Sequence, residues 1–368
     1  MSEANHKENQ ESNTPLSESE KWAQATEYWR VKLSGEQRII TPQHPDCRCS
    51  IVVPVYAESI ERIKKQLASI AEQLILPTQY EVIYVVNNSP LSKDDKNQVV
   101  ISRNQAVIEY LRSVTDAPVY VIDKSSTGNE IDECNVGKAR NRGVAEASLR
   151  YFENNKNGII IQTDADTYFE DKEYITSVLT AFDESPDVVG MAGGLVFEFD
   201  PDTLVLKERE LLRLKIDRLL HIKIWEGFQA FLSGQHEPTS KQTNFSGAHM
   251  LSRSYETAVI GGLNDEDFGE DQQFGFDLTK YAKHNNVRVV GMKDELRVIT
   301  ALRDSDRTPA SFKKTLDAID MLQPLVINGE IIDEKKIEEY EKIILDREGG
   351  QELIDYIRKS RNLLRIAK

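Results

Sequence analysis

Short apolar runs alternate with longer segments of helical periodicity from Ser50 onward. The runs are rich in Val and Ile and predict strands that are buried on both faces, at 50–56, 81–86, 118–122 and 158–162. The segments between them have the apolar spacing of helices, at 60–74, 96–114 and 136–154. Strands that alternate with helices are typical of an α/β domain with a mostly parallel central sheet, in which ligands bind at the carboxyl ends of the strands.

The chain on either side of this core has a different pattern. Residues 1–20 carry few large apolar side chains, so we expect a disordered tail. Residues 21–48 predict an N-terminal helical extension, 49–298 the α/β domain, and 299–368 a helical C-terminal region. Within the domain, 204–232 predicts an amphipathic helix with a basic face, which either packs on the core or docks on a membrane surface or a partner.

Composition excludes several classes of partner. The 46 Lys and Arg residues against 61 Asp and Glu residues give a net charge of −15, which repels nucleic acid. No segment is apolar enough to span a bilayer, and the N-terminus lacks the apolar run of a secretory signal, so we expect a cytoplasmic protein with at most peripheral membrane contact. We expect Cys47, Cys49 and Cys134 to be reduced thiols, because they are too few for a disulfide framework.

Two carboxylates, Asp164 and Asp166, follow the fourth predicted strand directly. Hard divalent cations bind oxygen ligands, and Mg²⁺ sites commonly combine one or two carboxylates with substrate phosphates. We therefore expect Asp166 to bind Mn²⁺ or Mg²⁺ directly and Asp164 to reach a ribose or a metal-bound water. The same spacing recurs at 200–202, 265–267 and 304–306, so position after an apolar strand, and not spacing, distinguishes this pair from a solvated turn or a helix cap.

Four motifs occur in the order seen in family-2 glycosyltransferases of the GT-A fold, namely 50–58, 135–143, 164–166 and 262–271. The chain resembles that family over about 49–281. The resemblance implies a GT-A fold and a nucleotide-sugar donor, with a UDP-sugar favoured. It also implies transfer to an acceptor hydroxyl, with Mn²⁺ or Mg²⁺ as cofactor, and leaves open whether the acceptor is a glycan, a lipid or a small molecule. The Gln-x-x-Arg-Trp element of processive polysaccharide synthases is absent, which favours transfer of a single sugar.

The resemblance also assigns roles to individual residues. Asp271 would be the base that takes the proton of the acceptor hydroxyl during inverting displacement, with Glu270 in reserve. Repulsion between these adjacent carboxylates can raise one pKa, although acidic residues also favour helix N-termini for dipole reasons. The donor would be contacted by Pro54, Val55, Tyr56, Glu58, Asn87, Asn88, Gly137, Lys138, Arg140, Asp164, Ala165, Asp166, Gly247 and His249. For His249 a place in the core is the alternative.

The sequence departs from the family pattern in two places. Asn87 and Asn88 stand where relatives carry an acidic pair that contacts the base, which weakens the inference of uracil. No histidine occurs where many relatives place a further metal ligand. The third ligand is therefore left open: it is His284, the nearest upstream histidine, or else Arg303 or Arg307 binds the diphosphate in place of full metal coordination.

Two alternative functions remain. A nucleotidyltransferase that forms nucleotide-sugars uses a similar sheet and metal-bound carboxylates, but it should carry a Gly-rich basic loop after the first strand, and 54–58 has none. A non-catalytic nucleotide-sugar-binding protein of the same fold would differ only in lacking turnover. The phosphate-binding motifs of P-loop and Rossmann enzymes are absent. The C-terminal helices would shape the acceptor site or a homodimer interface.

Overall fold

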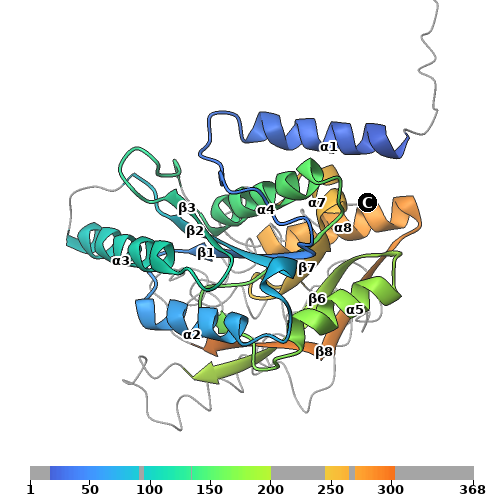
Figure 1. Ribbon diagram of the computed structural model, residues 1–368. Coiled ribbons are helices and arrows are strands. Elements are labelled where there is room, and N and C mark those ends of the chain that lie inside the picture. Colours follow the sequence, from blue (N-terminus) through green and yellow to red (C-terminus); the bar gives the residue numbers. More distant parts are fainter. Residues whose placement is uncertain (1–16, 91–94, 134, 200–244, 265–269, 303–368) are drawn as a thin grey trace, which may run out of the picture.

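The computed structural model describes residues 17–90, 95–133, 135–199, 245–264 and 270–302. Within them, eight strands form one sheet in the order β3-β2-β1-β4-β7-β6-β8-β5, with helices packed on both faces (Figure 1). The predicted mixed α/β architecture with a mostly parallel sheet is therefore confirmed.

Four parallel strands form one half of the sheet and match the predicted runs closely. They are β1 (Cys49–Val55), β2 (Tyr80–Asn87), β3 (Val119–Lys124) and β4 (Ile159–Gln162). Their crossover helices are α2 (Ile60–Ala71), α3 (Asp95–Ser113) and α4 (Val136–Glu153), and a short helix η1 (Pro77–Gln79) precedes β2. Since all four strands run the same way, their carboxyl ends meet at one edge.

The other half is mixed. It contains β5 (Thr167–Tyr168), α5 (Tyr174–Glu184), β6 (Val188–Phe199), β7 (Met250–Arg253), α7 (Ser254–Val259), α8 (Glu270–Asn285) and β8 (Arg288–Leu302). β7 lies antiparallel between β4 and β6, β6 pairs parallel with β8, and β5 pairs antiparallel with β8. The last strand thus runs to Leu302, beyond the boundary that we predicted at residue 298.

Two hydrophobic clusters cover the two faces of the sheet. Successive residues of a strand point to opposite faces, so Ile159 and Ile161 belong to one cluster and Ile160 to the other. The first cluster includes side chains of α2, α3 and α5, and the second includes side chains of α1, α4, α7 and α8. Because α4 follows β3, which runs parallel to β1 and β4, its N-terminal turn lies on the side of the sheet where these strands end.

The N-terminal helix α1 (Glu18–Lys32) begins earlier than the sequence indicated. Ser17 and Glu20 form a capping box, which satisfies backbone N–H groups of the first turn. The prediction of a disordered tail is therefore wrong for residues 17–20, and residues 1–16 lie outside the described part. α1 lies alongside α4 in Figure 1, and Trp29 on α1 is fully buried.

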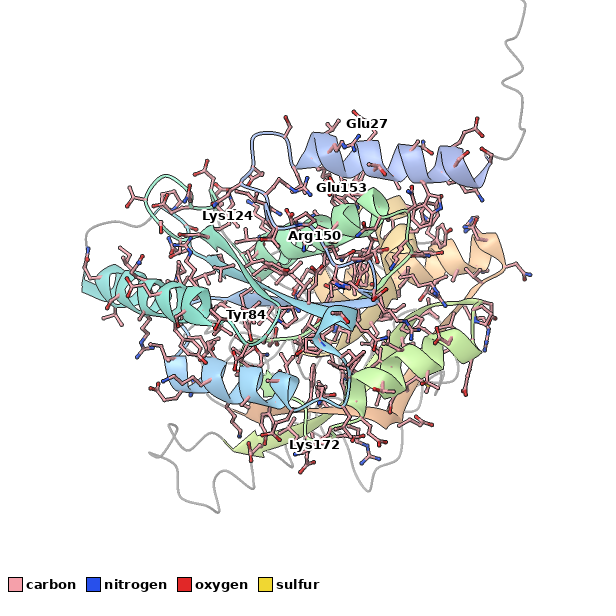
Figure 2. All side chains as sticks on the ribbon, in the orientation of Figure 1. Glu27, Tyr84, Lys124, Arg150, Glu153 and Lys172 are labelled. Carbon is pink, nitrogen blue, oxygen red and sulfur yellow. The ribbon has the colours of Figure 1, made fainter. Side chains whose placement is uncertain are left out.

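Ion pairs with buried carboxylates connect α4 to the segment after α1 and to the sheet. Arg38 donates to Glu146 of α4 at 2.9 Å, and the Glu146 side chain is fully buried. Arg150, which is labelled on α4 in Figure 2, pairs with Glu81 of β2 at 2.7 Å. Burial of a charge is tolerated where it is paired and hydrogen-bonded, so the first pair holds the segment after α1 on α4 and the second holds α4 on the sheet.

Several predicted elements lie outside the described residues. They are the basic helix at 204–232, the helices after residue 302, the carboxylate pairs at 200–202, 265–267 and 304–306, and Arg303, Arg307 and Cys134. Among the helices that the structure does describe, none combines the length and apolarity needed to cross a bilayer.

Replacing Trp29 by Ala should lower the free energy of unfolding by about 3–5 kcal/mol, because it leaves a large cavity under α1. Trp22 of the same helix is half-buried and packs on Phe152 with ring centroids 5.4 Å apart, so the matched Trp22→Ala change should cost less. Urea denaturation of both variants measures the difference. Equal losses would show that Trp29 is not the anchor of α1.

Candidate active site

The Asp164-Ala165-Asp166 segment follows the carboxyl end of β4, and Gln66 of α2 hydrogen-bonds to its backbone. The Gln66 Nε2 group donates to the carbonyl oxygens of Asp164 at 2.6 Å and Thr167 at 2.8 Å. Gln66 is buried, and so is Ala165, whereas Asp164 and Asp166 are half-buried. Both carboxylates are therefore carried on a fixed loop that solvent reaches.

Arg140 of α4 is the centre of the site. Its guanidinium is 1% exposed, yet it contacts groups from three separate segments. Nη2 lies 2.8 Å from Oδ1 of Asp164, Nη1 donates to the carbonyl oxygen of Gly247, and Nε lies 3.8 Å from Oε1 of Glu270. Burial alone would lower the pKa of Arg140, but the carboxylates of Asp164, Glu270 and Asp271 outweigh it and the pKa is raised. Arg140 is therefore a permanent buried cation.

The acidic pair begins α8 on the other side of this guanidinium. Glu270 is buried, and Asp271 is half-buried. Asp271 Oδ2 accepts the N–H of Gly247 at 2.7 Å, and its Oδ1 accepts the N–H of Gln272 at 2.7 Å. Burial raises the pKa of Glu270 to about 7 and also raises the pKa of Asp271, although Arg140 opposes both shifts. Carboxylates with raised pKa values are better bases near neutral pH.

Gly247 is required by packing in this site. A Cβ atom there would lie 2.6 Å from Nη2 of Arg140. The sequence resemblance implied that this glycine lines the sugar pocket, whereas the structure shows that its missing side chain makes room for the guanidinium. The backbone of Gly247 also joins Arg140 and Asp271, through its carbonyl oxygen and its N–H.

Neither His249 nor His284, the two histidines that the sequence suggested, lies in the site. His249 is fully buried, bonds Tyr174 through Nε2, and contacts the carbonyl oxygen of Gly194 through Nδ1 at 3.1 Å. Burial lowers its pKa to about 4, so it is a neutral side chain within the core, which favours the core alternative over the donor contact. His284 is exposed on the last turn of α8, the opposite end from Glu270, and is therefore unsuited as a third metal ligand.

The carboxyl ends of β1 and β2 lie next to that of β4, on the same side of the sheet. Pro54 and Val55 are buried within β1, and Tyr56 is half-buried after it. Glu58 is buried and pairs with Arg62 at 2.7 Å. These positions surround the turn that the resemblance assigns to the nucleoside.

The two amides at the end of β2, Asn87 and Asn88, turn toward the protein. Asn87 Nδ2 donates to the carbonyl oxygens of Val55 at 2.8 Å and Val85 at 3.1 Å. Asn88 is 1% exposed, and its Oδ1 accepts from Asn104 at 3.0 Å and from the hydroxyl of Ser125. Burial and these hydrogen bonds favour a structural role for the Asn88 side chain over the base contact that we predicted.

The first turn of α4 is capped by Asn135, whose Oδ1 accepts the N–H of Lys138 at 2.7 Å. Gly137 is buried, and Lys138 is half-buried with its Nζ donating to the carbonyl oxygen of Asp132 at 3.1 Å. The Lys138 ammonium group therefore contacts the loop before α4, whereas Arg140, two residues further along the helix, contacts Asp164.

No family model and no curated protein matches the sequence. Among solved structures, S. aureus TarS in complex with UDP-GlcNAc is similar at a TM-score of 0.44, with 17% identity over 80% of this chain and 70% of that chain. A mannosyltransferase from Pyrobaculum calidifontis, PcManGT, in complex with GDP-Man and Mn²⁺, is similar at 0.44, with 14% identity over 93% of this chain and 84% of that chain. Similarity at this level assigns neither an activity nor a ligand.

The described residues contain no cluster of three or more His, Cys, Asp or Glu side chains that could hold a metal ion. A site completed by substrate phosphates and waters needs fewer protein ligands, since Mg²⁺ is often bound by one or two carboxylates. Asp164 and Asp166 fit that requirement, because both are partly accessible on one loop. Arg140 contacts one oxygen of Asp164.

Two residues of the site could not be assigned from the sequence. Gln66 and Asn104 are polar residues on the sheet-facing sides of α2 and α3, and both are buried. The available signal was a polar residue on an apolar helix face, as between Ile63 and Ile70 for Gln66. That signal predicts a buried hydrogen-bond partner but does not identify it.

Proposed function

We propose that this protein is a glycosyltransferase that moves a single sugar from a nucleotide-sugar donor to an acceptor hydroxyl by inverting displacement. One observation carries the proposal: a single buried guanidinium, that of Arg140, contacts both Asp164 after β4 and Glu270 at the start of α8. Transfer needs a group that handles the leaving diphosphate and a base near the acceptor. The order of the sequence motifs, which resembles family-2 glycosyltransferases, supports the same assignment.

On the donor side, Asp166 and Asp164 would hold Mn²⁺ or Mg²⁺ against the diphosphate. When bound, the metal neutralises the charge that develops on the leaving group. The carboxyl ends of β1 and β2, with Tyr56 and Glu58, would hold the nucleoside. A UDP-sugar is favoured by the family resemblance.

On the acceptor side, Asp271 would take the proton of the acceptor hydroxyl. The oxygen then forms a bond to the anomeric carbon while the bond to the diphosphate breaks, which inverts the configuration. The N–H of Gly247 orients the Asp271 carboxylate, and burial raises its pKa toward the range useful for a base. Glu270 is the second candidate for this role.

The proposal is tested with a panel of UDP- and GDP-sugars plus Mn²⁺, by measuring release of the nucleoside diphosphate. Wild-type protein should release it from at least one donor, and Asp271→Asn should not. Asp277→Asn is the matched control, because Asp277 lies on α8 and bonds Gln273 at 3.0 Å, away from Arg140. Turnover by both Asp166→Ala and Asp271→Asn at the wild-type rate would refute the proposal.

Asp166→Ala is expected to abolish the part of nucleotide binding that depends on metal. Calorimetric titration of UDP or GDP with and without Mn²⁺ measures that part. Asp183→Ala is the control, since Asp183 is an exposed carboxylate paired with Arg48 at 2.6 Å. Mn²⁺ should strengthen nucleotide binding in the control as in wild type. Equal stimulation in Asp166→Ala would exclude Asp166 as the metal ligand.

A further inference from the structure

Asn104 of α3 lies where the ends of β1, β2 and β3 meet. Its side chain is fully buried, at 0% exposure. It belongs to none of the four motifs, and no step of the proposed transfer uses it. A fully buried amide needs partners for both its oxygen and its nitrogen.

Asn104 finds those partners on three separate segments. Its Oδ1 accepts the N–H of Ala57 at 2.8 Å. Its Nδ2 is a donor to the carbonyl oxygen of Asn87 at 3.1 Å, to Oδ1 of Asn88 at 3.0 Å and to Oγ of Ser125 at 2.9 Å. The position requires an acceptor and two donors together, which a carboxylate or an apolar side chain of the same size does not provide.

The contact with Ala57 holds a disfavoured backbone conformation. Ala57 has a φ of 50°, in the left-handed region that residues with a Cβ atom rarely adopt. It stands between Tyr56 and Glu58, and its conformation sets the direction in which both neighbours leave β1. A backbone held this way persists only where surrounding contacts impose it, and Asn104 supplies one to the N–H of Ala57 itself.

The contacts with Asn88 and Ser125 hold the ends of β2 and β3 together. The Ser125 hydroxyl donates to Oδ1 of Asn88, which also accepts from Asn104. The three side chains form a closed and buried set, so the end of β2 cannot shift without breaking several hydrogen bonds at once.

We infer that Asn104 is a positioning residue for the nucleoside half of the donor site. It orders the Tyr56–Glu58 turn and the end of β2 before the ligand arrives, and it does so from beneath, without touching the donor. The inference rests on the proposed function, which assigns the nucleoside to these strand ends. Pre-ordered loops bind more tightly because less conformational entropy is lost on binding. Asp271 belongs to other elements, so Asn104 affects affinity and not the chemical step.

The test compares N104L and N104D with wild type by calorimetric titration of UDP and of GDP, each with Mn²⁺. N104L removes every hydrogen bond and should weaken nucleotide binding about tenfold or more. N104D keeps the acceptor for the N–H of Ala57 but loses the donors, so its Kd should lie between the two. At saturating donor, kcat should stay near the wild-type value while KM rises. Q105L is the control, because Gln105 is the next residue of α3 and makes an exposed contact with Glu109 at 2.8 Å.

A second substitution separates positioning from a general loss of stability. Glycine adopts a φ of 50° without strain, so A57G in the N104L background should recover part of the lost affinity. If N104L does not fold, the same comparison is made in N104D. Failure of A57G to recover any affinity would overturn the inference.

The remaining outcomes are distinct. If wild-type protein binds the nucleotides and both Asn104 variants bind them with the same Kd, the inference is wrong and the proposed function stands, even where the variants unfold at lower temperature. If wild-type protein binds neither UDP nor GDP, the proposed function itself fails and the inference falls with it.

Discussion

Sugar transfer is expected to fall by about 10²–10⁴-fold when Asp271 is replaced by Asn, the usual contribution of a general base. The amide keeps an oxygen that can accept the N–H of Gly247, so the loop and the donor site should be preserved. Binding of the nucleoside diphosphate should therefore stay close to wild type. Single-turnover kinetics and calorimetry on the same preparation measure the two quantities separately.

Glu270→Gln distinguishes the two carboxylates of the pair. Glu270 is buried beside Arg140, whereas Asp271 is half-buried and accepts two backbone N–H groups, so we expect the smaller loss of turnover from Glu270→Gln. The Asp277→Asn control should keep the wild-type rate. A larger effect of Glu270→Gln than of Asp271→Asn would transfer the role of the base to Glu270.

Replacing Arg140 by Met is expected to abolish transfer and to lower the free energy of unfolding by about 3–5 kcal/mol, because removing one partner of a buried charge network leaves the others uncompensated. In this site the charges left without a cation are those of Asp164, Glu270 and Asp271. Denaturant titration measures the stability, and nucleoside diphosphate release measures the activity.

The loss of stability should also depend on pH. The pKa of Glu270 is raised in the folded protein, so the folded state binds more protons than the unfolded state between the ordinary carboxyl range and about pH 7. Stability from this group is therefore present at acidic pH and is lost as the pH rises through that window. Arg140 lowers the pKa values of Glu270 and Asp271, so Arg140→Met should extend the loss to higher pH and cost more at about pH 8 than at about pH 5.

Arg142 provides the matched control for this variant. It is also buried on α4 and pairs with Glu146 at 3.0 Å, outside the site. Arg142→Met should lower stability as well, but the folded protein should keep its activity and the pH dependence that Glu270 imposes. A similar pH profile in Arg140→Met and Arg142→Met would contradict the assignment of Arg140 as the counter-charge of the acidic pair.

The parallel half of the sheet was predictable because its strands are nearly continuous apolar runs. Ile159 to Ile161 face two different clusters, and a strand buried on both sides needs apolar residues at every position. The Asp164 and Asp166 pair was predictable for a related reason. A charged pair directly after a buried strand lies at the carboxyl end of that strand, where solvent reaches it. Glu270 and Asp271 came from motif resemblance, and the structure brings Glu270 to the same guanidinium as Asp164.

The mixed half and the interior of the site were not predictable in this way. β7 is inserted between β4 and β6, and the antiparallel pairing of Ile159 with Arg253 joins segments that no local pattern connects. The same limit applies to Gly247. A glycine in a motif indicates a close approach, but only the folded chain shows that the approaching group is Arg140 and not a ligand.

The insertion of β7 sets an order of events during protein synthesis. The pairs between β1, β2, β3 and β4 can form once Gln162 has left the ribosome, whereas β7, α8 and β8 emerge later. A partly made chain therefore presents β4 as an open edge, which is a site for mispairing with other chains. Arg140 lacks its contacts with Gly247 and Glu270 through the same interval, so the surroundings of its guanidinium are complete only after the later half of the chain has been made.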